Sequence, residues 1–201
     1  MPEHKVAINF DKTFDESLKD ISGGILLHAC CGPCATAVVE KFITTVRPTL
    51  YYFNPNIYPK SEYDLRLENL KTVAKFYDVP LVWETYDESQ FYDAVQNGDT
   101  SCEGGERCTA CFYLRLRKTA LKAKELGIST FCGTLTVSPK KNAQIINEVG
   151  MKIEHETGVR WLCSDFKKRN GYVRSVELSK QMDLYRQHYC GCVFSKRESN
   201  L

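Results

Sequence analysis

The sequence predicts an α/β fold in which a mainly parallel sheet carries helices on both faces. Five short apolar runs have the length of buried strands, and amphipathic segments bounded by Gly, Pro or Ser separate them. Strands that alternate with helices are joined by right-handed crossovers, which make neighbouring strands parallel. Because no internal repeat or low-complexity linker interrupts this alternation, we expect residues 1–201 to form a single domain.

The first half of the chain contains three predicted strands and three predicted helices. The apolar run at 25–29 lies between two glycines and a cysteine motif, and Pro33 suits the first turn of the helix that follows. Ser61 is expected to cap the next helix, whose apolar side chains share one face. The expected order is strand 25–29, helix 34–45, strand 50–53, helix 61–77, strand 80–84 and a short helix 88–96.

A glycine-rich loop at 97–107 leads into the second half of the chain. Cys108 is expected to open a long helix that Gly127 ends, and Gly158 marks the end of a later helix. The expected order is helix 108–126, strand 128–132, helix 141–157, strand 159–163 and helix 175–182. Ligands of open parallel sheets bind beyond the carboxyl ends of the strands, so the cysteines that follow the first strand should lie at a binding edge.

The composition is that of an ordinary globular protein, with 43% hydrophobic and 26% charged residues. A net charge of +2 is nearly balanced, so any contact with nucleic acid has to come from a local basic patch. We find no apolar stretch long enough for a signal peptide or a membrane span. The sequence therefore predicts a cytoplasmic protein with reduced thiols and no membrane partner.

Seven of the ten cysteines fall into three tight clusters. In a reducing compartment, closely spaced thiolates hold metal more often than they form disulfides. A [4Fe–4S] cluster or a structural zinc takes at most four cysteines, so seven indicate a second metal or a redox-active thiol pair. The last cluster predicts a C-terminal metal-binding extension. The clusters, which we expect to meet at one site, are Cys30, Cys31 and Cys34, then Cys108 and Cys111, then Cys190 and Cys192.

Two of the pairs, Cys31 with Cys34 and Cys108 with Cys111, have i, i+3 spacing at a predicted helix start. That spacing points both sulfurs to one side, and the positive end of the helix lowers the pKa of the thiols and favours an anionic cluster. Two such helix ends could clamp one iron–sulfur unit. Of the remaining cysteines, Cys132 and Cys163 are interpreted as buried hydrophobic residues and Cys102 as a candidate spare ligand.

Three other interpretations remain open. The segment Cys31-Gly-Pro-Cys34, between a strand and a helix, has the sequence and context of a thioredoxin active site, which leaves the other clusters unexplained. A cysteine pair with Cys190 and Cys192 could bind a structural zinc in a nucleic-acid-binding module. The amino-terminal strand, loop and helix resemble the Rossmann-like layout of ATP-pyrophosphatase (HUP) folds. Cysteines replace the Ser-Gly-Gly phosphate loop of those proteins, so the fold is expected without the ATP chemistry.

The chain resembles a known family, the epoxyqueuosine reductases of the QueH type. Five motifs carry the resemblance, occur in the family's order and extend from about Ile25 to Ser195. Each alone is weak, but together they are highly specific. They are His28-Ala-Cys-Cys-Gly-Pro-Cys, Phe53-Asn-Pro-Asn-Ile with Glu62 and Arg66 downstream, Glu106-Arg-Cys-Thr-Ala-Cys-Phe, Thr134-Leu-Thr-Val-Ser-Pro, and Tyr185-Arg-Gln-His-Tyr-Cys-Gly-Cys-Val-Phe-Ser.

This resemblance implies an oxidoreductase that completes queuosine synthesis. Such an enzyme removes the epoxide oxygen of epoxyqueuosine at the wobble position of tRNA without cobalamin, using a [4Fe–4S] cluster and an adjacent mononuclear iron. The implied partners are the modified tRNA and an external electron donor similar to ferredoxin or flavodoxin. We assign the cluster to Cys31, Cys108, Cys111 and Cys190, and catalytic roles to Cys30, Cys34 and Asp165; Cys34, which some members replace by aspartate, is a candidate for the lone iron.

Epoxide removal needs protons and a surface for the anticodon loop. The candidate proton donors, chosen by their nearness in sequence to basic or metal-binding segments, are Asp165, Tyr185, His188 and Tyr189. Splayed-out RNA bases stack on aromatic or arginine side chains, for which Tyr58 and Tyr172 are candidates. The expected RNA contacts are Lys140, Lys141, Lys167, Lys168, Arg169 and Arg174.

Overall fold

A five-stranded parallel sheet forms the centre of the chain in a computed structural model that describes residues 9–96, 98 and 103–199. The strand order is β3-β2-β1-β4-β5, and every neighbouring pair is parallel. The predicted α/β fold class is confirmed. The strands are β1 (Ile25–His28), β2 (Thr49–Tyr52), β3 (Leu81–Trp83), β4 (Thr130–Gly133) and β5 (Arg160–Trp161).

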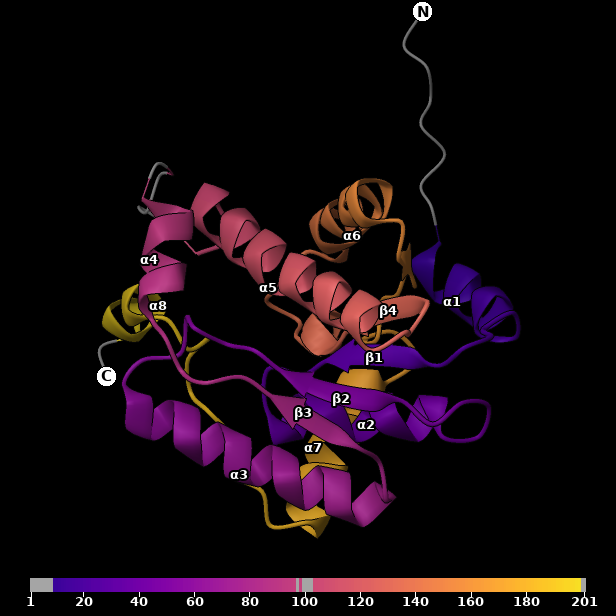
Figure 1. The fold of residues 1–201 in the computed structure, drawn as a ribbon. Coiled ribbons are helices and arrows are strands. Elements are labelled where there is room, and N and C mark those ends of the chain that lie inside the picture. The colour runs from indigo at the N-terminus through magenta and orange to yellow at the C-terminus, as the bar shows by residue number, and fades with distance from the viewer. Residues whose placement is uncertain (1–8, 97, 99–102, 200–201) are drawn as a thin grey trace, which may run out of the picture.

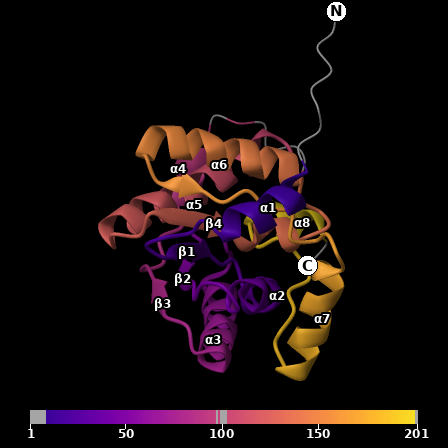
Figure 2. The ribbon, with the colours of Figure 1, turned by 90° about the vertical axis from the view of Figure 1, so that its right-hand side faces the viewer.

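Helices cover both faces of the sheet, as predicted (Figure 1). Helices α2 (Gly32–Phe42), α3 (Lys60–Tyr77) and α7 (Gly171–Gln181) lie on one face, and α5 (Glu106–Glu125) and α6 (Ala143–Thr157) lie on the other. Figure 2 shows the same two layers from the side. Leu27 of β1 packs into the core on the α2 face and its neighbour Leu26 into the core on the α5 face, because successive side chains of a strand point to opposite sides.

Three short elements were not predicted. They are helix α1 (Phe10–Leu18), the 3₁₀ helix η1 (Thr134–Val137) and helix α8 (Val193–Glu198). Helix α1 has a clear local signal, since the side chain of Asn9 caps its first turn and its buried residues Phe10, Phe14 and Leu18 recur at four-residue spacing. The remaining predicted helix, α4, spans Ser89–Val95.

Several predicted helix boundaries were wrong. Pro59 stands at the start of α3, in place of Ser61, and no side chain caps that end. Helix α7 begins at Gly171, four residues before the predicted start, and a Cβ at that glycine would lie 1.8 Å from the carbonyl oxygen of Phe166. Close backbone packing therefore places this helix start, and no sequence pattern encodes such packing.

The carboxyl ends of the parallel strands meet at one edge of the sheet. Cys30 follows β1 there, and Asn54, which follows β2, donates from Nδ2 to the carbonyl oxygen of Ala29 over 3.0 Å. Thr134, which follows β4, accepts from the backbone N–H of Cys30 over 3.4 Å. This edge carries the predicted cysteine site. Across the described part of the chain, no helix is both long and apolar enough to cross a bilayer.

Candidate metal centre

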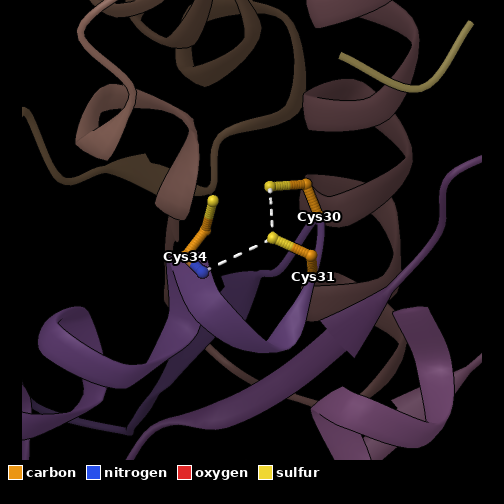
Figure 3. Close-up of side chains that lie close together, drawn as sticks. All are labelled: Cys30, Cys31 and Cys34. Carbon is orange, nitrogen blue, oxygen red and sulfur yellow. Dashed lines mark hydrogen bonds between the residues drawn. The ribbon is translucent and has the colours of Figure 1, made fainter. Parts of the chain in front are cut away.

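Three cysteine sulfurs converge at the start of α2. The Sγ atoms of Cys30, Cys31 and Cys34 all lie within 4.8 Å of one another, and Figure 3 shows them turned toward a common point. Cys31 caps the helix: its Sγ accepts from the backbone N–H of Cys34 over 3.4 Å and from Nε2 of Gln187 over 3.1 Å. A carboxamide and a backbone amide therefore both donate to this sulfur, as they do to thiolate ligands of metals.

Gly32 lets helix α2 approach α3 closely. A Cβ at this position would lie 2.7 Å from the backbone oxygen of Asn69, closer than side-chain carbons come in real structures. Asn69 in turn accepts from the backbone N–H of Tyr185 over 2.8 Å. The glycine within the first motif thus joins the cysteine-bearing helix start to the C-terminal segment through α3.

The other four clustered cysteines line one small cavity. Cys108 and Cys111 come from the first turns of α5, and Cys190 and Cys192 precede α8. Backbone N–H groups donate to two of these sulfurs, from Gly104 to Cys108 over 3.2 Å and from Ser195 to Cys192 over 3.4 Å. Cys102, the predicted spare ligand, lies outside the described residues.

A buried arginine holds the C-terminal cysteines in place. Arg66 of α3 donates from Nε to Glu62 over 2.7 Å, from Nη1 to the carbonyl oxygen of Cys190 over 3.0 Å and from Nη2 to that of Tyr189 over 3.2 Å. Gly191 has a φ of +132°, and a Cβ there would lie 3.1 Å from Nη1 of Arg66. Glu62 and Arg66 of the second motif therefore position candidate metal ligands more than a hundred residues away in sequence.

Two cations lie among the thiols. Arg115 of α5 is buried, and its Nε and Nη1 donate to the carbonyl oxygen of Cys111 over 3.4 Å and to Oδ1 of Asn54 over 3.3 Å. The Nζ of Lys141 donates to Sγ of Cys190 over 3.0 Å. Burial raises the pKa of the Cys111 thiol to about 11, and the charge of Arg115 opposes that rise.

The thiols at the start of α2 differ in pKa. Hydrogen bonding with Cys31 and Cys34 lowers the pKa of Cys30 well below its usual range, whereas burial raises the pKa of Cys31 to about 12. Neighbouring thiols share protons in this way because only one of them is stable as an anion without a cation between them. A bound metal ion would supply that cation and deprotonate all three.

A cleft of about 160 Å³ opens beside the sulfurs. Cys30, Cys34 and Cys190 lie in its wall, so the two cysteine groups adjoin, with Cys190 and Arg115 lining both hollows. The C-terminal segment contributes Arg186, Gln187, His188 and Tyr189. Further lining residues come from the segment after β4 and from α7, including Val137, Ser138, Pro139, Lys140, Tyr172 and Ser175.

The six residues predicted to contact RNA differ in whether their charge is already paired. Lys140 lines the cleft and is exposed. The guanidinium of Arg169 is paired with Asp11 and Asp15 over 2.5 and 2.6 Å, and that of Arg174 with Glu40 over 2.7 Å. Lys167 pairs with Asp165 over 2.8 Å. Carboxylates therefore already engage three of the six predicted RNA contacts, and the ammonium of Lys141 is engaged by a thiol.

The predicted proton donors also differ in position. His188 and Tyr189 line the cleft, whereas Asp165 and Tyr185 are absent from its described lining. The hydroxyl of Tyr185 donates to Glu62 over 3.1 Å. Tyr172, a predicted stacking platform, lines the cleft with the guanidinium of Arg186 5.9 Å from its ring centroid. Tyr58 is 40% exposed, and its carbonyl oxygen accepts from the hydroxyl of Tyr189.

Sequence reasoning missed Arg115, Gln187 and Arg186 as site residues. Arg115 follows Cys111 by four positions and so shares its helix face, a signal that was present in the sequence. The two C-terminal residues belong to the segment 182–192, where helix or strand periodicity is missing. Only the folded chain places them at the cleft.

The donor set fits iron–sulfur chemistry. Sulfur ligands favour soft or thiophilic metals, and N–H donors to the sulfurs together with buried cations offset the negative charge of a thiolate cluster. The buried Nη2 of Arg115 has no hydrogen-bond partner among the described residues, which suits a site that contains a further acceptor. Fold and site together define an α/β protein with a cysteine cluster that could hold a metal at the carboxyl edge of its sheet.

Comparison with known proteins identifies the family. A family model described as "Epoxyqueuosine reductase QueH" matches residues 25–198. Three relatives carry that same name. The one from Streptococcus pyogenes serotype M1 is 38% identical, and the match covers 94% of this chain and 79% of the relative. The one from Staphylococcus epidermidis is 40% identical, with 96% of this chain and 87% of the relative covered, and the one from Thermotoga maritima is 36% identical, with 88% and 92% covered. The chain belongs to the QueH family. This membership favours the reductase interpretation over dithiol exchange or a structural zinc.

Proposed function

We propose that this chain is an oxidoreductase that reduces epoxyqueuosine to queuosine at the wobble position of tRNA, in the cytoplasm and without cobalamin. The observation that carries the proposal is the gathering of cysteines from three segments of the chain. Six of them line two adjoining hollows, and the sulfur of the seventh, Cys31, lies within 4.8 Å of those of Cys30 and Cys34. The names of the relatives support the substrate. The reaction takes up two electrons and two protons, converts the epoxide to an alkene and releases the oxygen as water.

The arrangement of the sulfurs supports a division of the ligands into four and three. Cys108, Cys111, Cys190 and Cys192 would hold a [4Fe–4S] cluster, which needs four thiolates. Cys30, Cys31 and Cys34 would hold the lone iron. This grouping moves Cys31 from the predicted cluster set to the iron and adds Cys192 to the cluster. Three protein ligands leave a coordination position for substrate, as in other catalytic metal sites.

Together the two metal centres would supply single electrons and a Lewis acid for the epoxide oxygen. The residues of the chain then bind and orient the modified base. Tyr172 and Arg186 form a platform at the cleft on which a splayed-out base can stack. His188 and Tyr189 are the predicted proton donors that line the cleft, and we propose that one of them supplies a proton.

Lys140, which lines the cleft, and the exposed Lys168 form no ion pair within the described residues, so they are the better candidates for phosphate contact. We expect Lys140→Glu and Lys168→Glu each to weaken tRNA binding and to lower the slope of log affinity against log salt concentration by about one, as loss of a phosphate contact does. A salt titration of binding measures both. Lys12→Glu on α1, where the side chain is 75% exposed, is the matched control and should keep the parent slope. Equal slopes for all three variants would move the RNA surface elsewhere.

Anaerobic reconstitution tests the function directly. The chain is loaded with iron and sulfide, its metal and sulfide content is measured, and it is mixed with tRNA that carries epoxyqueuosine and with a chemical reductant. We expect more than four irons per chain and formation of queuosine in the tRNA. Cluster-loaded protein that leaves the epoxide intact, or full turnover with zinc alone, would contradict the proposal. An acidic ferredoxin or flavodoxin is the class of electron donor that we propose.

A further inference from the structure

Lys141 contacts one of the seven clustered cysteines. It lies in the segment between η1 and α6, and its Nζ donates to Sγ of Cys190 over 3.0 Å. The ammonium also lies 5.5 Å from the centroid of the Phe112 ring, and the backbone oxygen of Lys141 accepts from Nζ of Lys167 over 3.3 Å. The side chain and the backbone of this lysine are thus both held, and the ammonium is directed at one sulfur.

The sulfur that Lys141 contacts lies between the two cysteine groups. Cys190 lines both the small cavity of the four cysteines and the open cleft beside Cys30 and Cys34. Arg115 is the other residue that lines both hollows, and its buried guanidinium carries a second positive charge to the same place. Two cations therefore converge at the boundary between the two cysteine groups.

A buried positive charge beside a thiolate ligand makes the metal centre easier to reduce. Reduction of a metal–thiolate centre adds a negative charge, and a nearby cation or an N–H donor to the sulfur stabilises the reduced form more than the oxidised form. In a desolvated site the effect is much larger than in water, because the interaction between charges is less screened. The charge of an exposed lysine is screened by water and salt, so it changes the reduction potential far less.

We propose that Lys141 is a positioning residue that holds the sulfur of Cys190 at the boundary of the two centres and makes the cluster bound there easier to reduce. The inference rests on the proposed function, since it requires a redox-active metal group on Cys190. It replaces the predicted role of Lys141 in RNA contact with a role at the metal ligand. Arg115 supplies the second charge.

The test compares two adjacent lysines of the reconstituted chain of residues 1–201. Lys141→Met keeps most of the length of the side chain and removes the donor and the charge. Lys141→Arg keeps the donor and the charge, and Lys140→Met removes the same charge from the exposed neighbour. The reduction potential of the cluster is measured by redox titration followed by electron paramagnetic resonance. We expect Lys141→Met to lower the equilibrium constant for reduction of the cluster at least tenfold, which is a drop of about 59 mV in the potential of a one-electron couple. Lys141→Arg should keep most of the parent potential.

Binding of tRNA provides a second readout. Lys141→Met should leave the salt slope of tRNA binding at its parent value, whereas Lys140→Met should reduce that slope and leave the potential unchanged. An unchanged potential in Lys141→Met, or an equal shift in Lys140→Met, would overturn the inference. If Lys141→Met loses the cluster, retention in Lys141→Arg supports the positioning role and loss in both overturns it. Failure of the parent chain to assemble any cluster would instead refute the proposed function.

Discussion

Single alanine substitutions at the seven clustered cysteines are expected to fall into two classes. Loss of a thiolate from the cavity of four should abolish the brown iron–sulfur absorbance and the activity together, because a cluster rarely survives without one of its ligands. Loss of a thiolate from the group at α2 should keep that absorbance and reduce epoxide turnover more than about 100-fold. That is more than the usual loss when a residue that only hydrogen-bonds to a metal ligand is removed. The first class is Cys108, Cys111, Cys190 and Cys192, and the second is Cys30, Cys31 and Cys34.

Absorbance, iron and sulfide content and turnover of epoxyqueuosine tRNA separate these classes. Cys163→Ala is the matched control, since this partly buried cysteine belongs to neither group and should keep the spectrum and most of the activity. The grouping of Cys31 is the sharpest point of the comparison. If Cys31→Ala lost the cluster while Cys192→Ala retained it, the sequence-based assignment of Cys31 to the cluster would hold and the division proposed from the structure would be wrong.

Arg66→Met is expected to destabilise the protein by about 3–5 kcal/mol, the usual cost of breaking a buried ion pair. The substitution leaves Glu62, which is 11% exposed, without its cation, and it leaves the carbonyl oxygens of Tyr189 and Cys190 without a donor. Those oxygens belong to the segment that carries two proposed cluster ligands. We therefore expect a large loss of bound iron as well as a lower midpoint in a urea unfolding experiment.

The exposed pair between Arg47 and Asp78 provides the control. Its atoms are 2.8 Å apart, but the two side chains are 61% and 88% exposed, so Arg47→Met should cost no more than about 1 kcal/mol and leave iron binding intact. Equal unfolding midpoints for the two variants would show that Arg66 does not hold the C-terminal segment. A Glu62→Gln variant with reduced iron content would support the same network from the other side.

Local patterns in the sequence were sufficient for the sheet. The five apolar runs, the glycines at the ends of α5 and α6, and the alternation of strands with helices depend on neighbours within one element, and all five strands were predicted within one or two residues. The 3₁₀ helix η1 and helix α8 were missed because so few residues carry a periodic signal, whereas the signal of α1 was present in the sequence and was overlooked. The start of α7 was misplaced because it depends on contact between Gly171 and the backbone of Phe166.

The sequence by itself determined which residues carry the chemistry, because thiols are rare, reactive and recognisable by their spacing, and it determined the family through its five motifs. Only the tertiary structure decided how these residues combine. It separated the sulfurs into two groups, paired Arg169 and Arg174 with carboxylates, and turned Lys141 toward Cys190. The physical reason is that burial and hydrogen bonding between distant segments, such as Arg66 and Cys190, depend on packing that no local periodicity encodes.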